Sequence, residues 1–155
     1  MSVNMIFEGR TKQNLLTSNQ QNMSNWTKNG SFTITNTNGV NNISLSTGSS
    51  SEYIHLYDVS TIEGESYKFV FEGCTPSGFE YASGQSAQQF EIYSPKQEAV
   101  IASEYWNGEA SETYRTYSIT FTADNNKTHI LFPFGKLKDY TNYTMRIRNL
   151  ALYKI

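Results

Sequence analysis

The 155-residue chain lacks the features that would cross-link it or anchor it in a membrane. Its single cysteine, Cys74, excludes an intrachain disulfide framework, and we expect a small buried side chain there. No run approaches the roughly 20 apolar residues that cross a bilayer, and the N-terminus lacks the apolar stretch of a signal peptide. We therefore expect synthesis in a cytoplasm, no export by a standard route, and no membrane partner.

Charge is also scarce. Asp, Glu, Lys and Arg make up 17% of the residues, and the net charge is −2. No basic patch is available for a phosphate backbone, so nucleic acid is not an expected partner. An aromatic content of 14% argues against a disordered segment, and the low content of charged residues argues against a helical bundle.

Signatures of catalysis are missing as well. The sequence has no CxxC, HExxH, Walker or GxGxxG pattern. His55 and His129 each lie in an apparent strand without a nucleophile or acid motif beside them. The carboxylates Glu104, Glu109 and Glu112 could mimic the paired acids of a glycosidase, but acids on one loop would be poorly fixed. We expect no enzymatic activity.

What the chain does have is alternation with a period of two. In the segment "ESYKFVFEG", Tyr67, Phe69 and Phe71 share one side of an extended chain. Polar turn residues such as "NTNGV" and "TADNNK" separate the alternating segments. This pattern predicts half-buried antiparallel strands. The fold class we expect is all-β, an antiparallel β-sandwich of the jelly-roll type in a single domain, with a closed up-and-down barrel as the alternative. The other alternating pairs are Phe32 and Ile34, Ile43 and Leu45, Phe90 and Ile92, and Ile119 and Phe121.

The last segment, "YTMRIRNLALYKI", changes its parity. Met145 and Ile147 are odd-numbered, whereas Leu150 and Leu152 are even-numbered. Alternation survives such a shift only when one residue is extra, so we predict a β-bulge near residues 148–149.

Two segments together resemble a known family. The opening "QNLLTSNQQNMSNWTKNGSFTI" and the closing "YTMRIRNLALYKI" are similar to the ends of carbohydrate-binding-module-like jelly rolls. Such modules occur in bacteriophage tail, baseplate and minor structural proteins and beside secreted glycoside hydrolases. The resemblance implies a jelly-roll domain over residues 13–155, with residues 1–12 as an N-terminal arm or linker stub. It also implies that Trp26 is a packing residue.

The resemblance raises the question of a structural calcium ion. Relatives often hold one with a carboxylate near the closing strand, where this chain has Asn149. Glu8 in the opening segment is the other candidate ligand. Calcium takes six to eight oxygen ligands, and spacing alone does not assemble them. No other cofactor is expected.

Saccharide binding needs flat rings for the C–H faces of sugars and planar polar groups for the hydroxyls. The segment "ASEYWNGEAS" reads as a loop that offers Tyr105, Trp106 and Asn107. The alternative is that Trp106 folds back and caps the core.

A second candidate surface is one face of a sheet. In "EYIHLYDV", Tyr53, His55 and Tyr57 share the side opposite the apolar residues, and Tyr93 is placed similarly in its own segment. If the apolar residues face the core, these rings line an outer surface. Alternation also allows the reverse, with Tyr53 and Tyr57 buried.

These observations and the resemblance lead to one expected function. We expect a non-catalytic saccharide-binding module of a phage tail or baseplate, located in the virion, that binds host cell-surface or cell-wall polysaccharide through exposed aromatic residues. One alternative is a purely structural virion protein whose rings contact other tail proteins or further copies of this chain. Another is an ancillary module of a secreted glycoside hydrolase.

Overall fold

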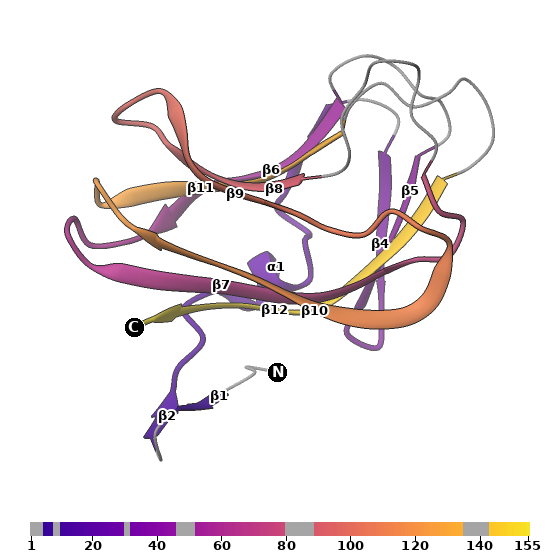
Figure 1. Ribbon diagram of the computed structural model, residues 1–155, viewed down its shortest axis with the longest axis horizontal. Coiled ribbons are helices and arrows are strands. Elements are labelled where there is room, and N and C mark those ends of the chain that lie inside the picture. The colour runs from indigo at the N-terminus through magenta and orange to yellow at the C-terminus, as the bar shows by residue number, and fades with distance from the viewer. Residues whose placement is uncertain (1–4, 8–9, 30–31, 46–51, 80–88, 135–142) are drawn as a thin grey trace.

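The computed structural model describes residues 5–7, 10–29, 32–45, 52–79, 89–134 and 143–155. Two five-stranded antiparallel sheets face each other, as Figure 1 shows, with the C-terminus at the lower sheet. The first, here called the β6 sheet, has the order β3 (Thr27–Asn29), β6 (Glu52–Ser60), β11 (Lys127–Phe134), β8 (Gln89–Ser94) and β9 (Ala99–Tyr105). The second, the β7 sheet, has the order β10 (Ser111–Thr122), β7 (Ser66–Thr75), β12 (Tyr143–Lys154), β5 (Val40–Leu45) and β4 (Phe32–Thr37). This is the expected all-β sandwich.

The core lies between the sheets and is built by the predicted alternation. Phe69 and Phe71 of β7 are fully buried, and Phe71 meets Phe90 and Phe132 from the opposite sheet with ring centroids 5.1 and 5.2 Å apart. Trp26 is buried against Phe132, with centroids 5.6 Å apart, as the resemblance implied. Such rings bury large apolar areas, so they supply much of the hydrophobic stabilisation.

The β-bulge predicted near residues 148–149 is present. The pairing of β12 with β7 shifts between Arg148 and Ala151, and Asn149 has a φ of 54°. Leu150 and Leu152 are therefore buried in the same core as Met145 and Ile147.

Two local elements were not predicted. The short helix α1 (Ser18–Gln21) begins at Thr17, whose side chain accepts a hydrogen bond from the Gln20 backbone while the Gln20 side chain accepts one from the Thr17 backbone. This reciprocal capping box stabilises a helix too short to show a periodic pattern. Outside the two sheets, β1 (Met5–Phe7) and β2 (Arg10–Lys12) pair with each other within the expected N-terminal arm.

Candidate binding face

The outer face of the β6 sheet carries most of the predicted binding residues. Ile54 and Leu56 of β6 are fully buried in the core. Because side chains alternate along a strand, Tyr53, His55 and Tyr57 lie on the opposite, outer side. The first of the two interpretations offered by alternation is thus the one the structure shows.

Tyr57 and His55 form a stacked pair on this face. Their ring centroids are 3.5 Å apart and their planes differ by 21°. The stack is possible because β6 bulges after Tyr57, where Asp58 has a φ of 55° and the register with β11 shifts. One face of the Tyr57 ring rests on the imidazole while the side chain remains 44% exposed. An apolar ring plane is therefore held in a fixed orientation and offered to a partner.

His129 of β11 connects this stack to β8. Its ring centroid is 5.0 Å from those of His55 and Tyr57, and it stacks on Tyr93 at 5.7 Å. Sequence analysis did not assign His129 to the site. The signal was the alternation in "THILFPF", where His129 has the opposite parity to the buried Ile130 and Phe132.

The register aligns these rings in rows that run across the strands. One row begins at Tyr57 of β6 and His129 of β11. It continues to Tyr93 of β8 and ends at the exposed Val100 of β9. At the three strand spacings of about 4.8 Å that separate β6 from β9, a row spans roughly 14 Å.

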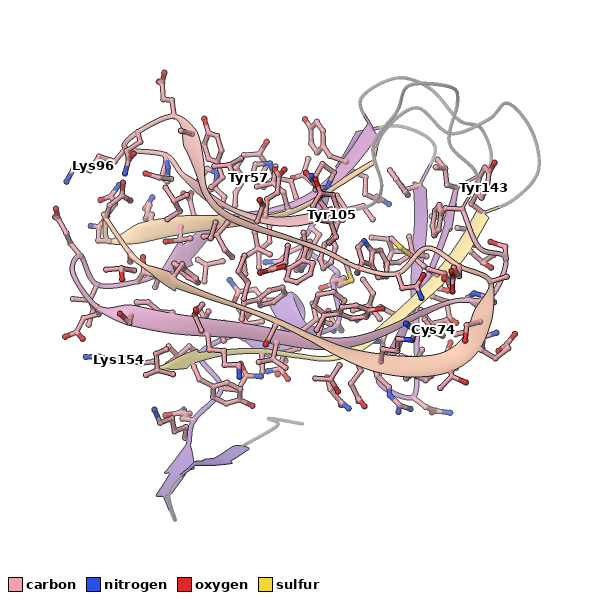
Figure 2. The ribbon with its side chains drawn as sticks, in the orientation of Figure 1. Tyr57, Cys74, Lys96, Tyr105, Tyr143 and Lys154 are labelled. Carbon is pink, nitrogen blue, oxygen red and sulfur yellow. The ribbon has the colours of Figure 1, made fainter. Side chains whose placement is uncertain are left out.

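A parallel row carries Tyr53 at one end and Tyr105 at the other. Tyr53 pairs with Pro133, and Gln89 pairs with Tyr105. Tyr105 is 60% exposed, and Figure 2 shows it with Tyr57 on the upper sheet. Tyr57 and Tyr105 are thus exposed on this face, with the half-buried rings of Tyr53 and Tyr93 beside them. A flat, extended ligand can lie against such a surface.

Burial favours the neutral form of both histidines. Burial, followed by the nearby charge of His129, lowers the pKa of His55 to about 4. Burial also lowers the pKa of His129, although Asp58 at 3.6 Å opposes this shift. In their neutral forms the two rings can lie close together beside Tyr57 without charge repulsion.

A carboxylate lies between the two rows of rings. Glu91 of β8 pairs with Leu131 on one side and with Ser103 on the other. Burial raises its pKa, and among the described residues it has no hydrogen-bond or ion-pair partner. A half-buried carboxylate without a partner is a strong acceptor for ligand hydroxyls.

The structure separates the residues of the predicted loop site. Residues 102–105 belong to β9 rather than to a loop, and Trp106 is 3% exposed. Its indole occupies the space that a side chain at Gly73 would need, 3.2 Å from the position of the missing Cβ. It also packs edge-on against Phe71, with centroids 5.9 Å apart. The prediction of Trp106 as a ligand contact is wrong in this structure, because capping the core buries its ring.

Asn107 shapes the connection after Trp106. Its backbone N–H donates to the Tyr117 hydroxyl at 3.2 Å, and its side-chain oxygen accepts from the Glu109 N–H at 2.8 Å. One contact lies within the turn and the other reaches β10 of the β7 sheet, so both hold the turn that follows Tyr105.

Of the two predicted calcium ligands, the structure describes Asn149. Asn149 donates through its side-chain nitrogen to Glu72, which also accepts from Arg148 Nε at 3.1 Å. Glu8 lies outside the described residues. Within the described part of the chain, His, Cys, Asp and Glu side chains form no group of three that could hold a metal ion. In the same part of the chain, no helix has the length and hydropathy to span a membrane.

Comparison by sequence finds no matching protein-family profile and no matching curated protein. Comparison by structure finds several similar domains. A solved CBM4 structure has a TM-score of 0.65 at 14% identity, with 85% of this chain and 96% of that chain covered. The second N-terminal cellulose-binding domain of Cellulomonas fimi β-1,4-glucanase C has a TM-score of 0.59 at 17% identity, with 92% and 95% covered.

A phage protein is also similar. The enzymatically active domain of tailspike protein 4 from bacteriophage CBA120 has a TM-score of 0.57 at 17% identity, with 92% of this chain but only 21% of that chain covered. At such identities the likeness shows the fold. This chain therefore has the jelly-roll β-sandwich of carbohydrate-binding modules, as its sequence predicted.

Proposed function

We propose that the protein is a non-catalytic saccharide-binding module and that the outer face of the β6 sheet is its binding surface. The observation that carries the proposal is the stack of Tyr57 on His55, which fixes an exposed ring on this face. Its fold, shared with a CBM4 domain and a cellulose-binding domain, supports the same conclusion.

The ligand class follows from the chemistry of the face. Tyr53, Tyr57, Tyr93 and Tyr105 offer ring planes and hydroxyls for an extended glycan, and Glu91 and Gln89 accept hydrogen bonds between them. The roughly 14 Å between β6 and β9 accommodates several sugar units laid across the strands. A polysaccharide fits this surface better than a single sugar does.

The setting we propose is the tail or baseplate of a phage virion, where host cell-surface polysaccharide is the ligand. The fold likeness to a phage tailspike domain supports it. Each site would bind weakly, because ligand hydroxyls exchange water for comparable hydrogen bonds. Display of many copies on one particle raises the avidity through effective concentration.

A pull-down with insoluble polysaccharides and bacterial cell walls tests the proposed function. The wild-type protein should sediment with at least one of these materials, and Tyr57→Ala and Tyr105→Ala should each reduce the bound fraction. The matched control is Tyr114→Ala on the β7 sheet, whose ring lies 3.8 Å below the Arg148 guanidinium. Equal binding by all four proteins would reject this face. A stable oligomer that buries Tyr57 and Tyr105 would instead favour protein contacts.

A further inference from the structure

A concave site lies away from the aromatic face, beside the β12 bulge. It is a pocket of about 550 Å³ bounded by α1, by the turn between β4 and β5, and by residues 148–150 of β12. Pockets that hold small ligands typically measure about 300–1,000 Å³. This volume is therefore sufficient for one small molecule.

The pocket is located where β12 changes its neighbour. Up to Arg148, which pairs with Val40, β12 borders β5. Beyond the bulge the N-terminal segment lies alongside, and Leu15 N–H donates to the Leu152 carbonyl at 2.8 Å. The pocket lies between the start of β5, at Val40, and this segment, and α1 forms one of its walls.

Hydrogen bonds made by two buried side chains fix the walls relative to one another. The side chain of Asn41 in β5 is fully buried and donates to the Gln21 carbonyl of α1 at 3.0 Å. Its side-chain oxygen accepts from the Asn36 side chain of β4 at 2.8 Å. Trp26 adds a bond from its indole nitrogen to the Gln20 carbonyl at 2.9 Å. A ligand would therefore meet a preorganised site, which lowers the entropic cost of binding.

Half of the ten lining residues carry a side-chain amide. A side-chain amide presents a donor and an acceptor in one plane, which matches the hydroxyl pairs of a sugar or polyol. None of the lining residues that the structure describes is aromatic or acidic. The amide-bearing residues are Gln21, Asn22, Asn36, Asn38 and Asn149.

Part of this hydrogen-bonding capacity is unused. Three of the amides donate through their nitrogen to the protein: Gln21 to the Leu16 carbonyl, Asn36 to the Asn41 side chain, and Asn149 to Glu72. Within the described residues their amide oxygens, and the whole side chain of Asn38, have no protein partner. Asn36, Asn38 and Asn149 are exposed, so these groups are open to a ligand that enters the pocket.

The charge of the pocket argues against an anion. Arg148 is the one charged lining residue that the structure describes, and its Nε already donates to Glu72 at 3.1 Å. We propose that the pocket binds a neutral polyhydroxylated molecule, a single sugar residue or a polyol, through amide hydrogen bonds without ring stacking. This site belongs to the β7 sheet and does not depend on the proposed role of the β6 sheet.

Side-chain amide NMR signals provide a direct test. The ¹⁵N-labelled protein is titrated in turn with glucose, galactose, N-acetylglucosamine and glycerol, and with inorganic phosphate as the anionic probe. At least one neutral probe should shift the NH₂ signals of Gln21, Asn22 and Asn38, with a dissociation constant on the order of 1 mM. The ring signals of Tyr57 should not follow that titration at the same concentrations.

Asn38→Gly is the matched variant. Asn38 has a φ of 51° in a turn with Gly39, so glycine keeps the backbone and removes the amide. Binding should weaken about fivefold, the effect of losing one hydrogen bond. Glu98→Gly, at a φ of 52° in another turn, is the control and should bind as the wild type does.

Asn38→Asp, which keeps the side-chain size, should also weaken the binding of a neutral ligand. No shift with any neutral probe, shifts with phosphate alone, or unchanged binding by Asn38→Gly would each overturn the proposal.

Discussion

The phenol ring of Tyr57 lies flat on the imidazole of His55, with centroids 3.5 Å apart. The bulge at Asp58 makes this possible by offsetting β6 from β11 at that point. The stack converts a mobile surface tyrosine into a fixed plane, and the proposed saccharide site depends on it.

Removing the Tyr57 ring should weaken glycan binding more than it weakens the fold. Tyr57→Ala should reduce affinity about tenfold, roughly 1.4 kcal/mol, because the apolar contact with a sugar ring is lost. The side chain is 44% exposed, so the unfolding midpoint should change little. Titration calorimetry with a bound glycan measures the effect. Tyr57→Phe keeps the ring and should retain most of the affinity. If Tyr57→Phe lost as much affinity as Tyr57→Ala, the binding energy would come from the hydroxyl and not from the ring.

Acid should destabilise the protein through the histidine pair. The pKa of His55 is lowered from 6.5 to about 4 in the folded state, first by burial and then by the charge of His129. Between these two pH values the unfolded chain binds more protons, so the free energy of unfolding should fall as the pH falls from 6.5 toward 4.

The size of this effect is on the order of 2 kcal/mol. Urea unfolding at a series of pH values measures it. His55→Phe keeps a ring under Tyr57 without the titrating group, and its stability should vary less over the same window. A variant with the full wild-type pH slope would show that His55 is not the cause.

Replacing Glu91 should stabilise the fold and weaken glycan binding. Burial raises its pKa, so ionisation above its unfolded value of 4.5 costs stability at neutral pH. Glu91→Gln should therefore raise the melting temperature at pH 7 and weaken glycan binding about tenfold, since a charged acceptor contributes roughly 1.5–3 kcal/mol. Calorimetric melting and titration on the same samples separate the two effects. A variant that melts higher and binds as well as the wild type would remove Glu91 from the site.

Trp106 should behave as a core residue. Trp106→Ala should cost about 3–5 kcal/mol of unfolding free energy, as large-to-small core changes do. Gly73→Ala should also destabilise, by about 1–3 kcal/mol, because its Cβ would lie 3.2 Å from the Trp106 and Phe71 rings. Denaturant unfolding tests both changes. If Trp106→Ala were as stable as the wild type but unable to bind glycans, the buried position would not represent the protein in solution.

Much of the fold could be predicted because the pattern is local. Alternation placed Phe69 and Phe71 together on one side of a strand, and that side faces the core. The parity change in the last strand located its bulge. For β6, alternation gave two possible faces and left the choice between them open. The helix α1 was not predicted because four residues are too few to show a periodic pattern. It is stabilised by the Thr17 cap.

The site was harder to predict because exposure depends on the opposing sheet. Tyr105 and Trp106 are adjacent, yet one is 60% exposed and the other 3%. What separates them is the glycine at position 73, distant in sequence, which leaves room for one indole. The contact of His129 with His55 likewise comes from pairing between distant strands, which a single sequence does not state.

The most direct test of the account follows the tyrosine ring signals by NMR while a glycan identified in the pull-down is added. The account predicts that the rings of Tyr53, Tyr57, Tyr93 and Tyr105 shift in a saturable manner and that Tyr114 does not. Shifts confined to Tyr114 and its neighbours, or no ring shifts despite binding, would contradict it.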